Sequence, residues 1–251
     1  MASPPSSGAP VPPARTTVSV VIPVHNEASY VEGALVDLFA DLDAVAVDRP
    51  GGAGELAVDV VVVENGSSDD TADQVAALAA TEPRLSLLRL ATPDYGAAMR
   101  EGFLTSSGDW VVAFDIDYFS GEFLTAAVAR DDADVVLASK RAPGSEDRRS
   151  TFRKTATWGF NLLLRALLAS NVSDTHGMKA LRRTVIDAVA GDVASTQDLF
   201  DTELVIRAER AGFRIVEVPV TVEETRESRS RLVRRVPRTV RGMWDIRRSL
   251  G

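Results

Sequence analysis

Two aspartates near the middle of the chain are spaced so that they could act together on one ligand. In "WVVAFDIDYFS", residues 110–120, five residues typical of a buried strand, Val111–Asp115, are followed by Asp117. Residues i and i+2 of an extended segment share a face, so the carboxylates of Asp115 and Asp117 are expected on one side of the strand end. Two like charges this close raise each other's pKa unless a cation lies between them. The alternative is that Asp117 only caps a helix beginning near Gly121.

The elements that must position this pair alternate regularly along the chain. Strand patterns cover residues 17–24, 56–65, 84–90, 109–115 and 133–139, and helical patterns cover 27–46, 67–80, 95–106 and 121–130. This alternation predicts right-handed crossovers and a mostly parallel sheet buried on both faces, which is the α/β class. Ligands of such sheets bind at the carboxyl ends of the strands. Four of the predicted strands run there into polar segments, "PVHNE", "ENGSSDD", "DID" and "SKR".

Composition excludes several classes of protein and site. The 251-residue chain is 45% apolar, which is ordinary for a soluble globular protein. It has no cysteine and two histidines, which argues against disulfides and zinc. The longest apolar stretches are shorter than the roughly 20 residues that cross a bilayer. We expect a flexible Pro/Ser-rich tail over 1–16, which lacks the features of a signal peptide, one domain over 17–229, and a basic amphipathic helix over 230–251.

Charge is concentrated at the C-terminal end. The formal net charge is −8, yet residues 226–251 hold nine arginines against Glu227 and Asp245, so this part is +7 and the remainder is −15. Apolar residues interleave with the arginines in a helical pattern. The helix could pack on the domain with a solvated basic face, or it could lie on an anionic membrane surface. The acidic remainder argues against binding to nucleic acid.

The order of the motifs resembles a known enzyme family. "VSVVIPVHNEASYVEGAL", "VVVVENGSSDDT", "YGAAMREGF" and "GDWVVAFDID" look like the nucleotide-sugar domain of inverting family 2 glycosyltransferases of GT-A fold. "VVLASKR", "FNLLLRALLASNVSDTHGMKALRR", "FDTELVIRAERAGFRIVEVPV" and "TRESRSRL" follow in the order of the branch that makes dolichyl- and polyprenyl-phosphate sugars, such as dolichyl-phosphate mannose synthases. The resemblance covers roughly residues 17–232. It implies a three-layer α/β/α fold with a mainly parallel, Rossmann-like sheet.

The resemblance also implies which residues bind the donor. Asp115 and Asp117 would hold Mg²⁺ or Mn²⁺, which stabilises a departing diphosphate. Relatives often have a polar residue where this chain has Phe119, so Ser120 or water would complete the coordination. An acidic pair usually recognises the base, and here it is Glu64 and Asn65. Glu64 could accept two hydrogen bonds from guanine, but a GDP-hexose and a UDP-hexose both remain possible. The residues implied to bind the nucleotide sugar, besides the two aspartates, are Pro23, Asn26, Glu27, Glu64, Asn65, Ser67, Gly96 and Arg100.

The implied acceptor is a polyprenyl phosphate. Its oxygen is ionised at neutral pH and can attack without a strong general base, so positive charge around it is the main requirement. The residues implied to act in catalysis are Asp115, Asp117, Asp174 and Arg141, and those implied to bind the acceptor phosphate are Arg141, Arg153, Lys179 and Arg229. Each of the basic residues could equally be a surface charge. His176 could supply a polar contact or be a structural histidine.

The resemblance therefore implies a metal-dependent, inverting hexosyltransferase that moves mannose or glucose to a polyprenyl phosphate by single displacement. The same donor chemistry with a soluble acceptor, such as a phosphorylated metabolite or a glycan, is one alternative. A non-catalytic nucleotide-sugar binding module is another. We expect a cytoplasmic enzyme associated peripherally with the cytoplasmic membrane face through its basic C-terminal helix, with a membrane-embedded partner or a second copy as further possible partners. The apolar segment "TWGFNLLLRALLA" is expected to be core, or else to approach the membrane.

Overall fold

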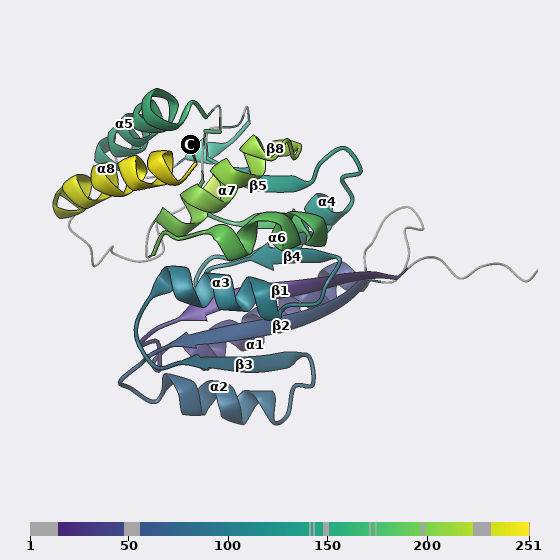
Figure 1. Ribbon diagram of the computed structural model, residues 1–251. Coiled ribbons are helices and arrows are strands. Elements are labelled where there is room, and N and C mark those ends of the chain that lie inside the picture. Colours follow the sequence, from purple (N-terminus) through teal and green to yellow (C-terminus); the bar gives the residue numbers. More distant parts are fainter. Residues whose placement is uncertain are drawn as a thin grey trace, which may run out of the picture.

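A computed structural model describes residues 15–47, 56–140, 142, 144–147, 151–170, 172–173, 175–196, 199–222 and 232–250. These residues form a central sheet with helices on both faces (Figure 1). This arrangement is the α/β fold that the alternating sequence pattern predicts.

The central sheet has seven strands in the order β3-β2-β1-β4-β7-β5-β8. All neighbouring strands are parallel except that β7 runs antiparallel to both β4 and β5. A second small sheet pairs β6 (Glu146–Asp147) with β9 (Thr221–Val222). The strands of the central sheet are β1 (Thr16–Val24), β2 (Leu56–Asn65), β3 (Leu85–Leu90), β4 (Trp110–Ala113), β5 (Val135–Ser139), β7 (Lys179–Arg182) and β8 (Ile215–Pro219).

Both faces of this sheet are buried, because successive residues of each strand enter opposite layers. In β1, Val20 and Ile22 join the core cluster on one face, whereas Val21 joins the cluster on the other. The first cluster includes residues of α1 (Val31–Val47), α2 (Thr71–Ala79) and α4 (Gly121–Val128). The second includes residues of α3 (Tyr95–Thr105), α6 (Arg183–Val189), the short 3₁₀ helix η1 (Ala190–Asp192) and α7 (Phe200–Arg210).

Two further helices, α5 (Thr151–Leu168) and α8 (Leu232–Ser249), lie side by side at one end of the molecule (Figure 1). Leu164 and Leu168 of α5 join Met243 and Ile246 of α8 in a third apolar cluster, which also includes Ile206 of α7. Both helices are thereby fixed to the α7 side of the sheet. Among the described residues, no helix is both long enough and apolar enough to cross a membrane.

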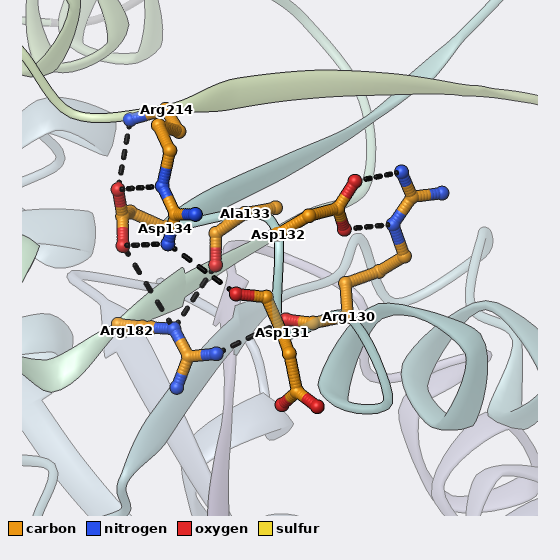
Figure 2. A network of polar contacts seen from close by, with 7 residues as sticks. All are labelled: Arg130, Asp131, Asp132, Ala133, Asp134, Arg182 and Arg214. Atoms are coloured by element: carbon orange, nitrogen blue, oxygen red, sulfur yellow. Dashed lines mark hydrogen bonds and ion pairs between the residues drawn. The ribbon is translucent and has the colours of Figure 1, made fainter.

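A charged network lies at the amino end of β5, away from the strand ends where ligands are expected (Figure 2). Asp134 accepts hydrogen bonds from the backbone N–H of Arg214, at 2.8 Å, and from its guanidinium. Arg182 donates to the carbonyls of Ala133 and Arg130 and lies over the ring of Trp110, 4.5 Å from its centroid. These contacts join β4, β5, β7 and the segment before β8, so the network holds these strands together at the amino end of β5.

Candidate active site

The predicted site residues of the first strand lie where β1 leaves the sheet. Pro23 is paired opposite Val63 of β2, and the pairing of β1 with β4 ends two residues earlier, at Val21 and Ala113. The missing N–H of Pro23 therefore costs no hydrogen bond to β4. After the strand, the carbonyl of Glu27 accepts from the N–H groups of Tyr30 and Val31, which begins α1. Glu27 also donates its own N–H to Thr71 Oγ1 at 2.8 Å.

Asn26 holds the loops after β1 and β2 together. Its φ of 55° is in the left-handed region, which asparagine tolerates better than most residues. Its Oδ1 accepts from Ser68 N at 2.8 Å and from Ser68 Oγ at 3.2 Å, and its N–H donates to Ser67 Oγ at 2.9 Å. Its Nδ2 lies 2.9 Å from His25 Nε2. The side chain of Asn26, which was predicted to contact the nucleotide, thus positions the loops after β1 and β2. The hydroxyl of Ser67 does the same.

Glu64 and Asn65, at the end of β2, are also engaged within the protein. Glu64 is 3% exposed, its Oε1 accepts from the N–H of Ser67, and its Oε2 lies 3.9 Å from Arg89 Nε. Oε1 therefore already accepts one hydrogen bond within the protein, and the role of Glu64 in binding the base stays a prediction. Asn65 Oδ1 accepts from the N–H of Asp94 at 2.7 Å, which orients its amide so that Nδ2 is left to donate.

Gly66 completes this part of the site. Its φ of 64° is left-handed, and a Cβ there would lie 2.9 Å from the backbone nitrogen of Pro93. The loop after β2 can therefore approach the start of α3 only with glycine at this position. Asp94 caps α3 by accepting from Ala97 N at 3.0 Å, and the predicted residue Gly96 is buried in the first turn.

Arg100 is engaged within the protein. From the second turn of α3 its Nη2 donates to the carbonyl of Val193, beyond η1. The guanidinium therefore ties α3 to the segment after η1, and its contact with the donor stays a prediction. The helical spacing of "YGAAMREGF" could not show this, because the partner lies 93 residues away in the chain.

The two aspartates of the "DID" motif lie in a turn, not on the strand. Strand β4 ends at Ala113, and Asp115 and Tyr118 exchange backbone hydrogen bonds at 3.0 and 3.3 Å. Ile116 between them is 6% exposed and packs into the core, whereas Asp115 is exposed and Asp117 is partly exposed. Ile116 thus turns inward between two aspartates that both reach the surface, and the charge of Asp117 acts on Asp115. The helix that follows is capped by Ser120, whose Oγ accepts from Phe123 N at 3.1 Å, so Asp117 is not its cap.

The turn suits a divalent cation but does not supply a full set of ligands. Although part of Asp115 reaches solvent, the surrounding protein desolvates its carboxyl and raises its pKa, as do the charges of Asp201 and Asp117, whereas Lys179 and Lys140 lower it. A bound cation would offset this repulsion. Phe119 packs against the apolar core, and Ser120 Oγ already accepts the cap hydrogen bond of α4, so it would have to share this oxygen to complete the coordination. Within the described part of the chain, no three His, Asp or Glu side chains gather around one point.

A cavity of about 160 Å³ adjoins Asp115 on the side of β7 and α7. Lys179 lies in its wall but is only 2% exposed, and its Nζ is 3.0 Å from Asp201 Oδ1 and donates to the carbonyl of Gly177 at 2.8 Å. The sequence suggested that Lys179 binds the acceptor phosphate. The burial of the ammonium and its pairing with a carboxylate argue against this role, which stays a prediction.

Asp201 and Tyr95 line the cavity but were not among the predicted site residues. Tyr95 Oη donates to Asp201 Oδ2 at 2.8 Å. The available signal was three consecutive polar residues, Asp201 to Glu203, in the first turn of α7, all of which are buried. His176 also lines the cavity and packs edge-on against Phe160, with ring centroids 5.2 Å apart.

The remaining predicted residues fall outside what is described. Arg141, Asp174 and Arg229 are not among the described residues, and the side chain of Arg153 is not described within α5. Their roles in catalysis and in binding the acceptor phosphate stay predictions.

The fold and the site together define a class of protein. Mannosyltransferase PcManGT from Pyrobaculum calidifontis, solved in complex with GDP-Man and Mn²⁺, has a similar fold with a TM-score of 0.60 and 23% sequence identity. The match covers 94% of this chain and 64% of that one. The chain thus has the GT-A fold of nucleotide-sugar transferases.

Sequence comparison assigns the family. The model of glycosyl transferase family 2 matches residues 19–189, and the chain belongs to this family. Glycosyltransferase AglD of Haloferax volcanii is 32% identical, over 93% of this chain and 38% of the relative. Undecaprenyl-phosphate mannosyltransferase of Micrococcus luteus is 31% identical, over 86% of this chain and 87% of the relative. The chain therefore spans well under half of the first relative and most of the second.

Proposed function

We propose that the protein transfers a neutral hexose from a nucleotide diphosphate sugar to a polyprenyl phosphate by single displacement with inversion. The observation that carries the proposal is the turn that presents Asp115 and Asp117 beside the interlocked loops after β1 and β2. The Micrococcus luteus relative, an undecaprenyl-phosphate mannosyltransferase that is matched over most of its length, supports the choice of acceptor.

In the proposed reaction, an oxygen of the acceptor phosphate forms a bond to the anomeric carbon while the bond from that carbon to the donor's β-phosphate oxygen breaks. The electron pair of the broken bond leaves with the nucleoside diphosphate. Asp115 and Asp117 would hold Mg²⁺ or Mn²⁺, which offsets the charge that grows on the leaving diphosphate. Asn26 holds the loops after β1 and β2 together, and Gly66 lets the second of these loops approach the start of α3. No general base is required, because the acceptor oxygen is already ionised.

Transfer of radiolabelled sugar tests this function directly. Purified protein is incubated with Mn²⁺, UDP-glucose or GDP-mannose, and either a polyprenyl phosphate or a water-soluble phosphorylated acceptor. We expect transfer to the lipid, abolished in Asp117→Ala. Transfer only to the soluble acceptor would refute the lipid acceptor, and tight nucleotide-sugar binding without turnover on any acceptor would instead identify a binding module.

We also propose that α5 and α8 place the enzyme on an anionic membrane surface. Five large apolar side chains are exposed among the described residues, and three of them lie on these helices. Their exposed fractions are 59% for Trp158, 53% for Leu162 and 44% for Trp244. Trp158 and Leu162 are four residues apart and share one face of α5, with the exposed Arg165 one turn further on.

Charge complementarity supports a lipid surface as the occupant. Helix α8 contains six arginines and a single acidic residue, Asp245, in a chain that is acidic elsewhere. Arg241 and Arg248 are exposed and lie one turn on either side of Trp244, and Arg247 lies over its ring, 5.5 Å from the centroid. Tryptophan prefers the interface between lipid and water, and arginine is attracted to anionic headgroups, by about 1 kcal/mol per residue.

Flotation with vesicles of anionic and of neutral lipids tests this placement at low and high salt. We expect the wild type to float with anionic vesicles, and Trp158→Ser and Trp244→Ser to weaken the binding. Leu104→Ser is the matched control, since Leu104 is 47% exposed on α3. Deletion of residues 230–251 should remove the salt-sensitive part of binding. Equal flotation by all variants would refute the proposal.

A further inference from the structure

Glu217 lies in the middle of β8, the edge strand of the central sheet, and is paired opposite Leu137 of β5. Its carboxylate accepts two hydrogen bonds from a single residue, Ser173. Oε1 accepts from the backbone N–H and Oε2 from the hydroxyl, each at 2.5 Å. Hydrogen bonds to a charged acceptor are stronger than those between neutral groups. The carboxylate therefore fixes Ser173, which belongs to the segment that joins α5 to β7.

Two further serines connect this contact to neighbouring loops. Ser139, the buried last residue of β5, has its Oγ 2.9 Å from Ser173 Oγ. A hydroxyl has one hydrogen to donate, and that of Ser173 goes to Glu217, so Ser139 is the donor in this contact. The carbonyl of Ser139 accepts from Ser145 Oγ at 2.6 Å, and the same Oγ accepts from Val220 N at 3.4 Å. The loop after β5, the segment before β7 and the end of β8 are thus held together.

The segment that joins α5 to β7 also forms part of the cavity wall. Ser173 is followed by the buried Thr175, whose hydroxyl lies 3.0 Å from that of Thr202 in α7. The next two residues, His176 and Gly177, line the cavity of about 160 Å³. The contact with Glu217 is therefore three residues away in the chain from the first of these two wall residues, and a shift of Ser173 would displace the wall.

We propose that Glu217 is a positioning residue for the transfer reaction, because through Ser173 it holds the wall formed by His176 and Gly177 in place beside Asp115. This inference rests on the proposed function and adds to it a residue that does not itself line the cavity. A misplacement of about 1 Å by a change far from the reacting atoms can lower a rate about 100-fold. The contact of the same segment with α7 limits the displacement, so a smaller loss is expected here.

Transfer kinetics and calorimetric melting of five proteins test this role: wild type, Glu217→Gln, Ser173→Ala, the double variant and Asp109→Asn. Asp109 is the matched control, because its carboxylate also accepts from the backbone N–H and the hydroxyl of one residue, Thr17, at 2.9 and 2.8 Å. This contact lies directly before β4, at the amino end of the strand and away from the cavity. The kcat is measured below the lowest Tm, with Mn²⁺, saturating polyprenyl phosphate and whichever of UDP-glucose or GDP-mannose the wild type uses.

We expect kcat to fall about 10-fold in Glu217→Gln and in Ser173→Ala, the size associated with one hydrogen bond to a charged group. Because both changes remove the same contact, the double variant should also lose about 10-fold, and not the roughly 100-fold of two independent effects. The Kd for UDP or GDP should change less than about 2-fold in every variant. Asp109→Asn should lower Tm to a similar extent and keep the wild-type kcat.

A role of Glu217 in stability alone predicts a different pattern. A wild-type kcat in Glu217→Gln and Ser173→Ala, an equal loss in Asp109→Asn, or multiplied losses in the double variant would overturn this inference and leave the proposed function standing. If Glu217→Gln does not fold, Ser173→Ala tests the same contact by a smaller change. A wild type that transfers no sugar to any acceptor would overturn the proposed function itself.

Discussion

Replacing Lys179 by methionine distinguishes a buried structural charge from a ligand for the acceptor. The side chains of Lys179 and Asp201 are 3% and 5% exposed, and their charged atoms are 3.0 Å apart. Removing the ammonium leaves the Asp201 carboxylate buried without a counter-charge, and loss of one partner of a buried pair costs about 3–5 kcal/mol. For a chain of this size each kcal/mol lowers Tm by about 2–4 °C, so Lys179→Met should melt about 6–20 °C below the wild type.

Calorimetric melting of four proteins tests this estimate: wild type, Lys179→Met, the double variant Lys179→Met/Asp201→Leu, and Lys140→Met. The double variant should recover much of the lost stability, because no charge of the pair is then left buried. Lys140 is the matched control, since it also lies near Asp115 but is partly exposed, and its loss should cost at most about 1 kcal/mol. If Lys179→Met melts with the wild type and only raises the KM for the acceptor, the lysine is an acceptor ligand and the reasoning from burial is wrong.

Three further outcomes follow from contacts in the structure. Hydrogen bonds from Arg214 lower the pKa of Asp134. A carboxyl whose pKa is lowered in the folded state stabilises the fold at pH values above its ordinary pKa near 4, and this stabilisation is lost as pH falls through the folded-state pKa. The Tm difference between wild type and Asp134→Asn should therefore be largest at about pH 6 and shrink below about pH 4. Ser120→Ala should lower stability by about 1 kcal/mol through loss of the α4 cap. It should leave Mn²⁺ binding unchanged, as measured by electron paramagnetic resonance with UDP present. Asp117→Asn should weaken Mn²⁺ binding. If Ser120→Ala weakened Mn²⁺ binding and Asp117→Asn did not, Ser120 would be a metal ligand. Gly66→Ala should lower the free energy of unfolding by about 1–3 kcal/mol, because a Cβ there would meet Pro93 in a left-handed turn. It should also weaken nucleotide binding in titration calorimetry. Gly212 is left-handed as well but lies in open space, so Gly212→Ala should lower stability alone.

The regular elements were predictable because their apolar periodicity is a local property of the chain. The segment 56–65 was expected as a strand and β2 has the same bounds, and the strand expected over 133–139 contains β5. The antiparallel strand β7 was not predicted. It is four residues long, "KALR", and three of its residues are buried by strands on both sides, so it has neither the length nor the alternation of a strand pattern.

The sequence predicted the positions of the expected donor-binding residues, but it did not predict their contacts. Sequence placed Asn26, Glu64, Asn65, Asp115 and Asp117 at the carboxyl ends of neighbouring strands, and that is where they lie. The sequence could not show that the side chain of Asn26 forms hydrogen bonds with Ser68 in the neighbouring loop, since Ser68 is 42 residues away in the chain. Nor could it show that a turn, and not the strand, directs the two aspartates. Local spacing predicts which residues reach an edge of the sheet, whereas their contacts depend on which loop lies opposite.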